Sequence, residues 1–185
     1  KVTGELDYRC WVLEPTKSAK CRVSDLRAHF KNTYCTAEAC KGLNLLKAIK
    51  YMDDVLEHKA VVPFRKFTGG IGRHAMCKNV GHHNGRFPEK SVKHVKALLI
   101  NLKSNAEANG LDLERCQISH VVTQRAVNGR RRTYRAHGRI SPYLSSNCHV
   151  EFHVVEKAVG VKRMDKQQVR LTKKQAAKQR LAIGK

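Results

Sequence analysis

A basic stretch that contains no acidic residue constrains this chain more than any other feature of its sequence. It runs from Arg115 to Val150, with strand-like composition at both ends and a crowd of arginines in the middle. At ~3.3 Å per residue, two strands of ~14 residues would project on the order of 50 Å. Because a lone two-stranded hairpin is marginally stable in water, we expect a negatively charged partner to hold this one in place.

The charge of the whole chain also indicates a polyanionic partner. Its 185 residues include 37 Lys+Arg against 15 Asp+Glu, which gives a formal net charge of +22. Such an excess destabilises a compact protein by self-repulsion, and the phosphates of nucleic acid are the usual counter-charge. An anionic membrane is the other candidate, but no apolar run approaches the roughly 20 residues that span a bilayer. No secretory signal is recognised either, so we expect no membrane partner.

The seven cysteines and ten histidines require that a metal site be considered. The tightest cluster is Cys77 with His82 and His83, but the chain has no C-x-x-C pair. The paired spacing of a structural zinc site is therefore missing. We expect reduced thiols, no metal and no cofactor.

Candidates for catalysis are weak as well. Asp53 and Asp54 are adjacent on a predicted helix, so their carboxylates point in different directions and are expected to be solvated. His149, Glu151 and His153 share one face of a predicted strand, which permits a catalytic or metal-binding interpretation. On an outward face of a basic domain, such residues more often contact RNA or water. We expect that the protein is not an enzyme.

Apolar periodicity predicts a small two-layer α+β body. Thr36 is the better of two candidate N-caps for a short first helix, Thr33 being the other. The strand that begins at Cys116 is expected to place Ile118 and Val122 on the inward face. We predict helices at 36–41, 45–58 and from 89 or 91 to 109, and strands at 20–27 (an edge strand), 116–122 and 150–154.

Two further segments lack the apolar content of a core. Residues 65–88 mix glycine, histidine and scattered cations, and we predict a long loop that becomes ordered against a partner. The tail from 158 to 185 is strongly basic, and such tails are generally disordered until they meet nucleic acid.

The arginine-rich middle of the long stretch has the chemistry of an RNA-binding segment. The guanidinium groups of Arg130–Arg132, Arg135 and Arg139 can fork onto phosphate oxygens. Tyr134 and Tyr143 can stack on unpaired bases. A merely solvated loop would have no reason to exclude every acidic residue over this length, so we predict an RNA contact.

Several short motifs stand out between residues 15 and 157. They are Pro15-Thr16-Lys17-Ser18, His29-Phe30-Lys31-Asn32-Thr33, Val62-Pro63-Phe64-Arg65, Gly69-Gly70-x-Gly72-Arg73, Ser104-Asn105-Ala106-Glu107 and Arg130-Arg131-Arg132-Thr133-Tyr134-Arg135-Ala136-His137-Gly138-Arg139-Ile140. Together they resemble the motifs of one protein family, the large-subunit ribosomal proteins numbered twenty-two in bacteria and seventeen in eukaryotes. The resemblance extends over about residues 15 to 157, and the insertion between Pro63 and Pro88 resembles the eukaryotic or archaeal branch.

The resemblance implies a particular architecture. It is an α+β fold in which a small antiparallel three-stranded sheet packs on about three helices, with a long protruding β-hairpin and basic tails. We expect an N-terminal extension at 1–18 and a globular domain at 19–157. The domain would include the loop insertion 65–88 and the hairpin 115–156, and the basic C-terminal tail would be 158–185.

The resemblance also implies a function and a set of partners. The protein would be a structural constituent of the large ribosomal subunit that binds ribosomal RNA and lines the nascent-peptide exit tunnel with its hairpin. Its partners would be ribosomal RNA, neighbouring large-subunit proteins and the nascent polypeptide. It would be cytoplasmic, with assembly in the nucleolus if eukaryotic. The alternative is a free RNA- or DNA-binding assembly or chromatin factor.

Two sets of residues follow from these arguments. The predicted RNA contacts are Arg65, Lys66, Arg73, Arg125, Arg130, Arg131, Arg132, Tyr134, Arg135 and Arg139. The predicted tunnel-lining residues at the hairpin tip are Arg131, Arg132, Arg135, Ala136, His137, Gly138 and Arg139.

Overall fold

The computed structural model describes residues 15–157 and 172–183, and over these ranges the fold is α+β. An antiparallel sheet has the strand order β1-β7-β4. Its strands are β1 (Ser18–Leu26), β7 (Cys148–Glu156) and β4 (Cys116–Arg125). The basic strand β1 lies at an edge, as its composition predicts, since charge on an edge strand discourages stray pairing. The predicted fold class is confirmed.

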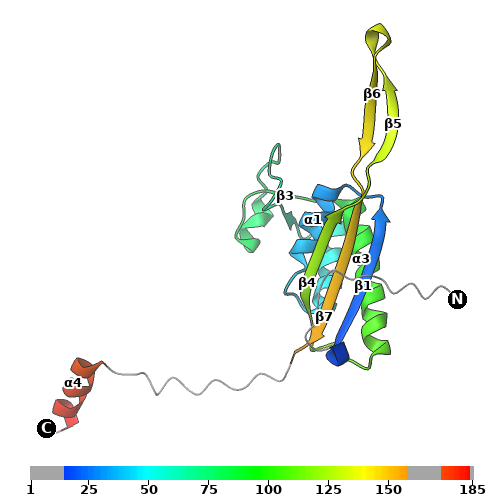
Figure 1. Ribbon diagram of the computed structural model, residues 1–185. Helices are drawn as coiled ribbons and strands as arrows, with labels where there is room; N and C mark the ends of the chain where they lie inside the picture. Colours follow the sequence, from blue (N-terminus) through cyan, green and yellow to red (C-terminus); the bar gives the residue numbers. More distant parts are fainter. Residues whose placement is uncertain (1–14, 158–171, 184–185) are drawn as a thin grey trace.

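Three helices cover one face of this sheet (Figure 1). They are α1 (Phe30–Ala39), α2 (Leu45–Leu56) and α3 (Glu89–Ala108). Helix α3 packs on β1, α1 packs on β4, and α2 packs on α3. The core between the two layers includes the fully buried side chains of Phe152, Leu99, Leu102, Met52, Leu45 and Ile118.

Helices α2 and α3 lie where the apolar periodicity predicts them. The side chain of Asn44 caps α2, because its Oδ1 accepts a hydrogen bond from the Leu46 N–H at 3.0 Å. Helix α2 ends two residues before the predicted end at His58, which adopts a left-handed φ of 59°. Such a residue cannot continue a right-handed helix.

The prediction for the first helix is wrong at both ends. Helix α1 begins at Phe30 and contains both threonines in its interior. The Thr33 and Thr36 hydroxyls donate to the carbonyls of His29 and Asn32, four residues back, instead of capping a terminus. Both threonines are buried. Their hydroxyls are hydrogen-bonded within the helix. The sequence alone does not distinguish such an internal threonine from one that caps the start of a helix.

Strand β4 contains a bulge that reverses one predicted orientation. Its register against β7 shifts between Ile118 and His120. As a result Val121 is buried, whereas Val122, which was expected on the inward face, is only half-buried. One extra residue in a strand exchanges the faces of all residues beyond it.

The insertion 65–88 carries more structure than the predicted loop. Strand β2 (Val62–Pro63) pairs with β3 (Gly85–Arg86), and the 3-10 helix η2 (Ala75–Val80) lies between them. The Cys77 side chain is fully buried below β3, so a Cβ at Gly85 would meet its Sγ at 2.5 Å. The ends of the insertion are thus packed on the body, and the prediction of a loop without regular structure is wrong there.

The C-terminal tail also contains an element that was not predicted. Helix α4 (Lys173–Ile183) begins with a capping box, since Thr172 and Gln175 exchange hydrogen bonds through their side chains and backbone N–H groups. Ala, Lys, Gln, Arg and Leu are strong helix formers, and they outweigh the lack of an apolar stripe. The rest of the predicted tail, 158–171, and residues 1–14 of the predicted extension lie outside the described residues.

Candidate nucleic-acid interface

The hairpin leaves the body as a direct continuation of its sheet (Figure 1). Strand β5 (Gly129–Tyr134) follows β4, and β6 (Ile140–Ser145) leads into β7. At the junction three residues, 126–128, lie opposite two, 146–147. The Ala126 N–H donates to the Asn147 carbonyl at 3.0 Å, and the Phe30 N–H donates to Ser146 at 3.1 Å. About half of the predicted long ribbon is therefore body, and only β5 and β6 project.

The strand register defines two different faces of the projecting ribbon, because directly paired side chains share a face. One face carries the pairs Arg130–Leu144, Arg132–Pro142 and Tyr134–Ile140. The opposite face carries the pairs Arg131–Tyr143 and Thr133–Ser141. Among the described residues of β5 and β6 none is fully buried. The ribbon therefore has no core of its own.

Aromatic rings on the ribbon are accessible to a partner. Tyr134 is 77 % exposed and Tyr143 is 56 % exposed. The Arg131 guanidinium lies 5.2 Å from the centre of the Tyr143 ring, a cation–π contact across the ladder. That contact positions the guanidinium before any phosphate arrives.

The tip is a tight turn with left-handed backbone. The Arg135 N–H donates to the Arg139 carbonyl at 2.8 Å, and the short helix η3 (Ala136–Gly138) lies between them. Gly138 tolerates its φ of 68°, but His137 adopts φ 61°, which is uncommon for a residue with a Cβ. All residues from Tyr134 to Ile140 are exposed. The predicted tip residues therefore project fully into solvent.

A cluster of aromatic rings at the root of the hairpin joins two predicted contacts from distant parts of the chain. The Arg125 guanidinium lies 5.0 Å from the Phe30 ring centre, and the Phe30 and Phe67 centroids are 5.9 Å apart. Tyr34 completes the cluster at 5.6 Å from Phe67, with the Lys66 ammonium 4.9 Å from its ring. The end of β4, helix α1 and the insertion therefore meet in one aromatic cluster, which carries Arg125 and Lys66.

The other two predicted cations of the insertion are exposed but lie apart from this cluster. Arg65 donates to the Val80 carbonyl at 3.4 Å, and Arg73 forms an isolated β-bridge with Asn84. The structure thus brings together Arg125 and Lys66, keeps the arginines of the ribbon in a second group, and holds Arg65 and Arg73 on the insertion.

Two cations were missing from the predicted set. Lys31 lies 5.7 Å from the Phe67 ring centre, and Arg86 donates to the Gly70 carbonyl at 2.9 Å. Both line a hollow of about 350 Å³ beside the root cluster, whose lining contains no acidic residue. Lys31 lies within a motif of the family resemblance, but nothing in its local sequence indicates the direction of its side chain.

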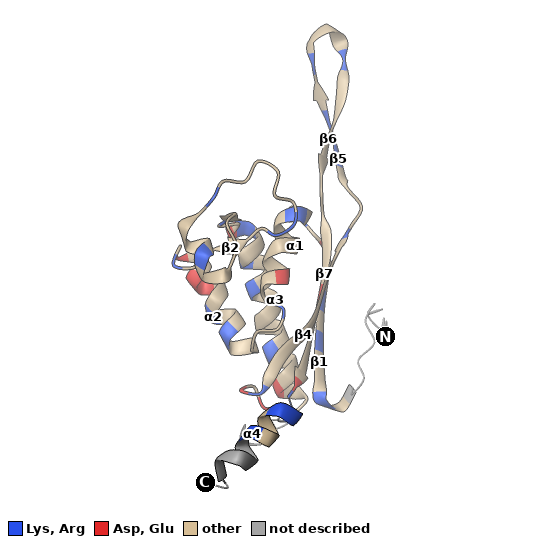
Figure 2. Ribbon diagram, turned by 90° about the vertical axis from the view of Figure 1, so that its left-hand side faces the viewer, with Lys and Arg blue, Asp and Glu red and all other residues tan. Residues whose placement is uncertain are grey.

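Charge is unevenly distributed between body and hairpin (Figure 2). Aspartate and glutamate occur on the body, whereas in the projecting hairpin, residues 129–145, arginine is the only one of Lys, Arg, Asp and Glu that occurs. Body cations find carboxylates nearby, as in the Lys96–Asp53 and Lys103–Glu107 ion pairs. The arginines of the hairpin meet no acidic residue within their own segment. Their positive potential is therefore directed outward, toward a partner.

The buried strand β7 corrects one prediction about polar residues. Glu151 and His153 were expected on an outward face in contact with RNA or water, but both are buried. The Glu151 Oε1 lies 3.3 Å from the Arg22 Nε of the paired strand. Burial lowers the pKa of His153 below its usual value, and nearby His120 and Lys20 lower it further. Both residues belong to the structure of the sheet.

The thiols have the environment of core residues. Among the residues described, Cys21, Cys35, Cys40, Cys77, Cys116 and Cys148 are free and buried. Burial raises the pKa of Cys21 to about 12 and that of Cys35 to about 11.

Within 15–157 and 172–183, no group of three or more His, Cys, Asp or Glu side chains is placed to hold a metal ion. No helix in the described ranges is long and apolar enough to cross a membrane.

The structure joins a compact α+β body to a projecting arginine ribbon without acidic residues. Comparison with known proteins identifies the family. The family described as Ribosomal protein L22p/L17e matches residues 21–155, and the chain belongs to it. Its members are structural ribosomal proteins and not enzymes.

Relatives from distant organisms match over most of their length. Large ribosomal subunit protein uL22 of Theileria parva is 51% identical over 173 residues, covering 92% of each chain. Its counterpart in Dictyostelium discoideum is 53% identical over 147 residues, covering 78% of this chain and 82% of the relative. That of Bombyx mori is 46% identical over 171 residues, covering 92% and 91%.

Proposed function

We propose that this protein is a constituent of the large ribosomal subunit, binds ribosomal RNA through its hairpin and insertion, and lines the nascent-peptide exit tunnel with the hairpin tip. The observation that carries the proposal is a ribbon that projects from the body without a core and without an acidic residue. Such a ribbon is stabilised little by contacts with its own chain and would be stabilised strongly by contacts with phosphate. The relatives, named as large ribosomal subunit proteins, support the same assignment.

The chemistry of the ribbon suits irregular RNA. Guanidinium groups bind phosphate oxygens in a bidentate manner, and Arg131 is already positioned by Tyr143. The exposed ring of Tyr134 offers a stacking surface for an unpaired base. At the root, Arg125 and Lys66 form a second set of phosphate contacts. We therefore assign RNA binding to both ends of the hairpin.

The tip has a different role in this proposal. Residues 135–139 form a tight turn that exposes both cations and the His137 ring. A narrow turn at the end of a ribbon can reach between RNA helices and present its residues to a polypeptide in the tunnel. The partners are then ribosomal RNA, neighbouring large-subunit proteins and the nascent chain, in cytoplasmic ribosomes assembled in the nucleolus if the source is a eukaryote.

The proposed division of the chain follows this assignment. Residues 19–157 form the body with its hairpin and insertion, and 1–18 and 158–185 are an extension and a basic tail. The hairpin determines the place of the protein in the particle, while the body provides the base from which it projects.

Replacement of Arg130, Arg131 and Arg132 by glutamate tests this function. We expect the triple variant to be excluded from large subunits in cells that also express the unmodified protein, because carboxylates would face phosphate. The readout is the fraction of tagged protein in purified subunits. The matched control replaces the exposed body residues Lys50, Lys90 and Lys93 by glutamate, with the same change of charge, and is expected to enter far more efficiently. Equal incorporation of the two variants would contradict the proposal.

A further inference from the structure

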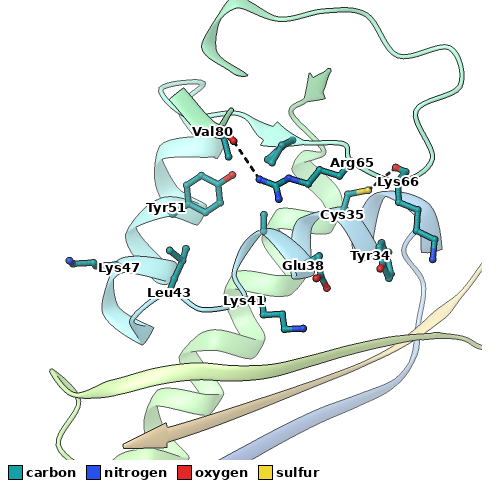
Figure 3. A pocket seen from close by; sticks show the side chains of 12 residues that line it. Tyr34, Cys35, Glu38, Lys41, Leu43, Lys47, Tyr51, Arg65, Lys66 and Val80 are labelled. Atoms are coloured by element: carbon teal, nitrogen blue, oxygen red, sulfur yellow. Dashed lines mark hydrogen bonds between the residues drawn. The ribbon is translucent and has the colours of Figure 1, made fainter. Parts of the chain in front are cut away.

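A groove on the body lies beside the root cluster, with which it shares Tyr34 and Lys66, and apart from the projecting ribbon (Figure 3). It has a volume of about 680 Å³ and lies where α1, α2, β2 and η2 meet. This volume is within the range of sites that take a small ligand or a few side chains. The residues that line it are Tyr34, Cys35, Glu38, Ala39, Lys41, Leu43, Lys47, Tyr51, Pro63, Arg65, Lys66 and Val80.

The interior of the groove is mainly apolar. Leu43, Pro63 and Val80 present aliphatic surface, and Val80 is 38 % exposed. The Tyr51 hydroxyl donates to the Val61 carbonyl at 2.8 Å, so its polar group is satisfied and its ring serves as wall. Apolar side chains that cover such surface gain free energy in proportion to the area removed from water. A sugar-phosphate backbone offers no such surface.

Cations surround this apolar interior. Lys41, Lys47, Arg65 and Lys66 line the groove with a single carboxylate, Glu38. Two of the cations are already held in place, because Arg65 donates to the Val80 carbonyl and Lys66 lies over the Tyr34 ring. Figure 3 shows Arg65 and Lys66 on one side of the groove and Lys47 on the other. A ligand with an apolar centre and negative charge on both sides would match this arrangement.

We propose that the groove docks an extended acidic peptide segment of a neighbouring protein. One or two apolar side chains of the peptide enter between α1 and α2, and flanking carboxylates pair with Lys41, Lys47 and Arg65. The occupant differs from that of the ribbon because Leu43, Pro63 and Val80 give the groove an apolar interior. Apolar side chains of a peptide can cover that surface, whereas a sugar-phosphate backbone cannot. The groove thus supplies a site for the neighbouring-protein contacts of the proposed function, on a surface separate from the RNA-binding ribbon.

Fluorescence anisotropy on the full chain tests the proposal. The probe is a labelled peptide with a central Leu-Phe pair flanked on each side by glutamates, measured at physiological salt. We expect Val80→Glu and Lys47→Glu each to weaken binding by about tenfold, since one places a carboxylate in the groove and the other reverses a cation beside it. Both positions are exposed, so the fold should persist, and circular dichroism melting checks this.

Matched probes and variants separate the groove from general attraction to a basic protein. A peptide of equal charge with Ser-Ser in place of Leu-Phe should bind about tenfold more weakly. Arg130→Glu on the ribbon should leave peptide binding within about twofold while it reduces affinity for a uridine-rich RNA oligomer. Equal binding of both peptides, or no effect of either groove variant, would overturn the proposal. So would groove variants that weaken binding of the RNA oligomer instead.

This outcome is independent of ribosomal assembly. Loss of peptide binding with normal RNA binding concerns the groove alone, whereas normal incorporation of the triple arginine variant concerns the proposed function alone. Each proposal can therefore fail while the other stands.

Discussion

The body and the projecting hairpin share one ribbon, in which β4 leads into β5 and β6 leads into β7, but the two regions are stabilised in different ways. In the body, β4 and β7 bury Ile118 and Phe152 against the helices. Beyond the junction at 126–128, β5 and β6 expose Tyr134 and Leu144 to solvent. One part is held by apolar burial and the other by ladder hydrogen bonds and a few cross-strand contacts. A continuous ribbon can therefore be stabilised by a core along β4 and β7 and still lack one along β5 and β6.

Core truncation should show the largest difference between the two regions. We expect Phe152→Ala to lower the free energy of unfolding by about 3–5 kcal/mol, because it leaves a cavity in a fully buried site. Tyr143→Ala on the ribbon should change it by less than about 0.5 kcal/mol. Urea titration followed by circular dichroism measures both. Comparable losses would mean that the ribbon has a core after all.

The bulge in β4 can be tested by two adjacent substitutions. Val121→Asp should destabilise the body by about 3 kcal/mol, since it buries a carboxylate at an inward position. Val122→Asp should cost clearly less, because its side chain is half-exposed on the other face. The same urea titration decides the order, and a reversed order would restore the regular alternation that the sequence suggests.

Salt dependence should reveal how many arginines of the hairpin meet phosphate. For single-stranded or irregular RNA, the slope of log K against log salt is about −0.7 per phosphate neutralised. Replacement of Arg131, Arg132 and Arg135 by glutamine should therefore reduce the magnitude of the slope by roughly 2. Filter binding of the full chain to large-subunit RNA fragments over a salt series measures it. An unchanged slope would mean that these three arginines do not contact phosphate and that the phosphate contacts lie on the body.

The buried thiols of the body should make the free energy of unfolding depend on pH, with a smaller effect than the substitutions above. Burial raises the pKa of Cys40 from 9.0 to about 12, so the folded state keeps a proton that the unfolded state releases. The stabilising contribution is complete below pH 9 and is lost as pH rises toward 12. Between pH 9 and pH 10 we expect a loss of about 1 kcal/mol from this thiol. Cys40→Ala should reduce the loss by that amount, and an identical pH slope in the variant would contradict the assignment.

Periodicity in the sequence predicted most of the body correctly. The apolar steps from Leu45 to Leu56 and from Val92 to Ala106 define α2 and α3, since burial along one stripe dominates the energetics of a helix. The absence of acidic residues predicts a separate function for the hairpin. Both signals are spread over many residues, and a single exception does not remove them.

The errors arise where one residue or one contact decides the structure. A bulge near Ser119 exchanges the faces of Val121 and Val122, and no pattern in the sequence marks it. Thr33 and Thr36 serve equally well as caps or as internal residues bonded to the preceding turn. The groove and the root cluster join α1, β2 and the insertion, segments that are distant in sequence. Their geometry depends on tertiary packing that local propensity does not contain.

Amide hydrogen exchange on the full chain, alone and in assembled large subunits, tests the central claim most directly. In the isolated protein we predict that amides of β4 and β7 exchange slowly, whereas those from Gly129 to Ser145 exchange close to the unprotected rate, because nothing covers the ribbon. In the subunit the same ribbon amides should become strongly protected. Strong protection of the ribbon in the isolated protein would contradict the account and favour a free nucleic-acid-binding factor that folds completely without the ribosome.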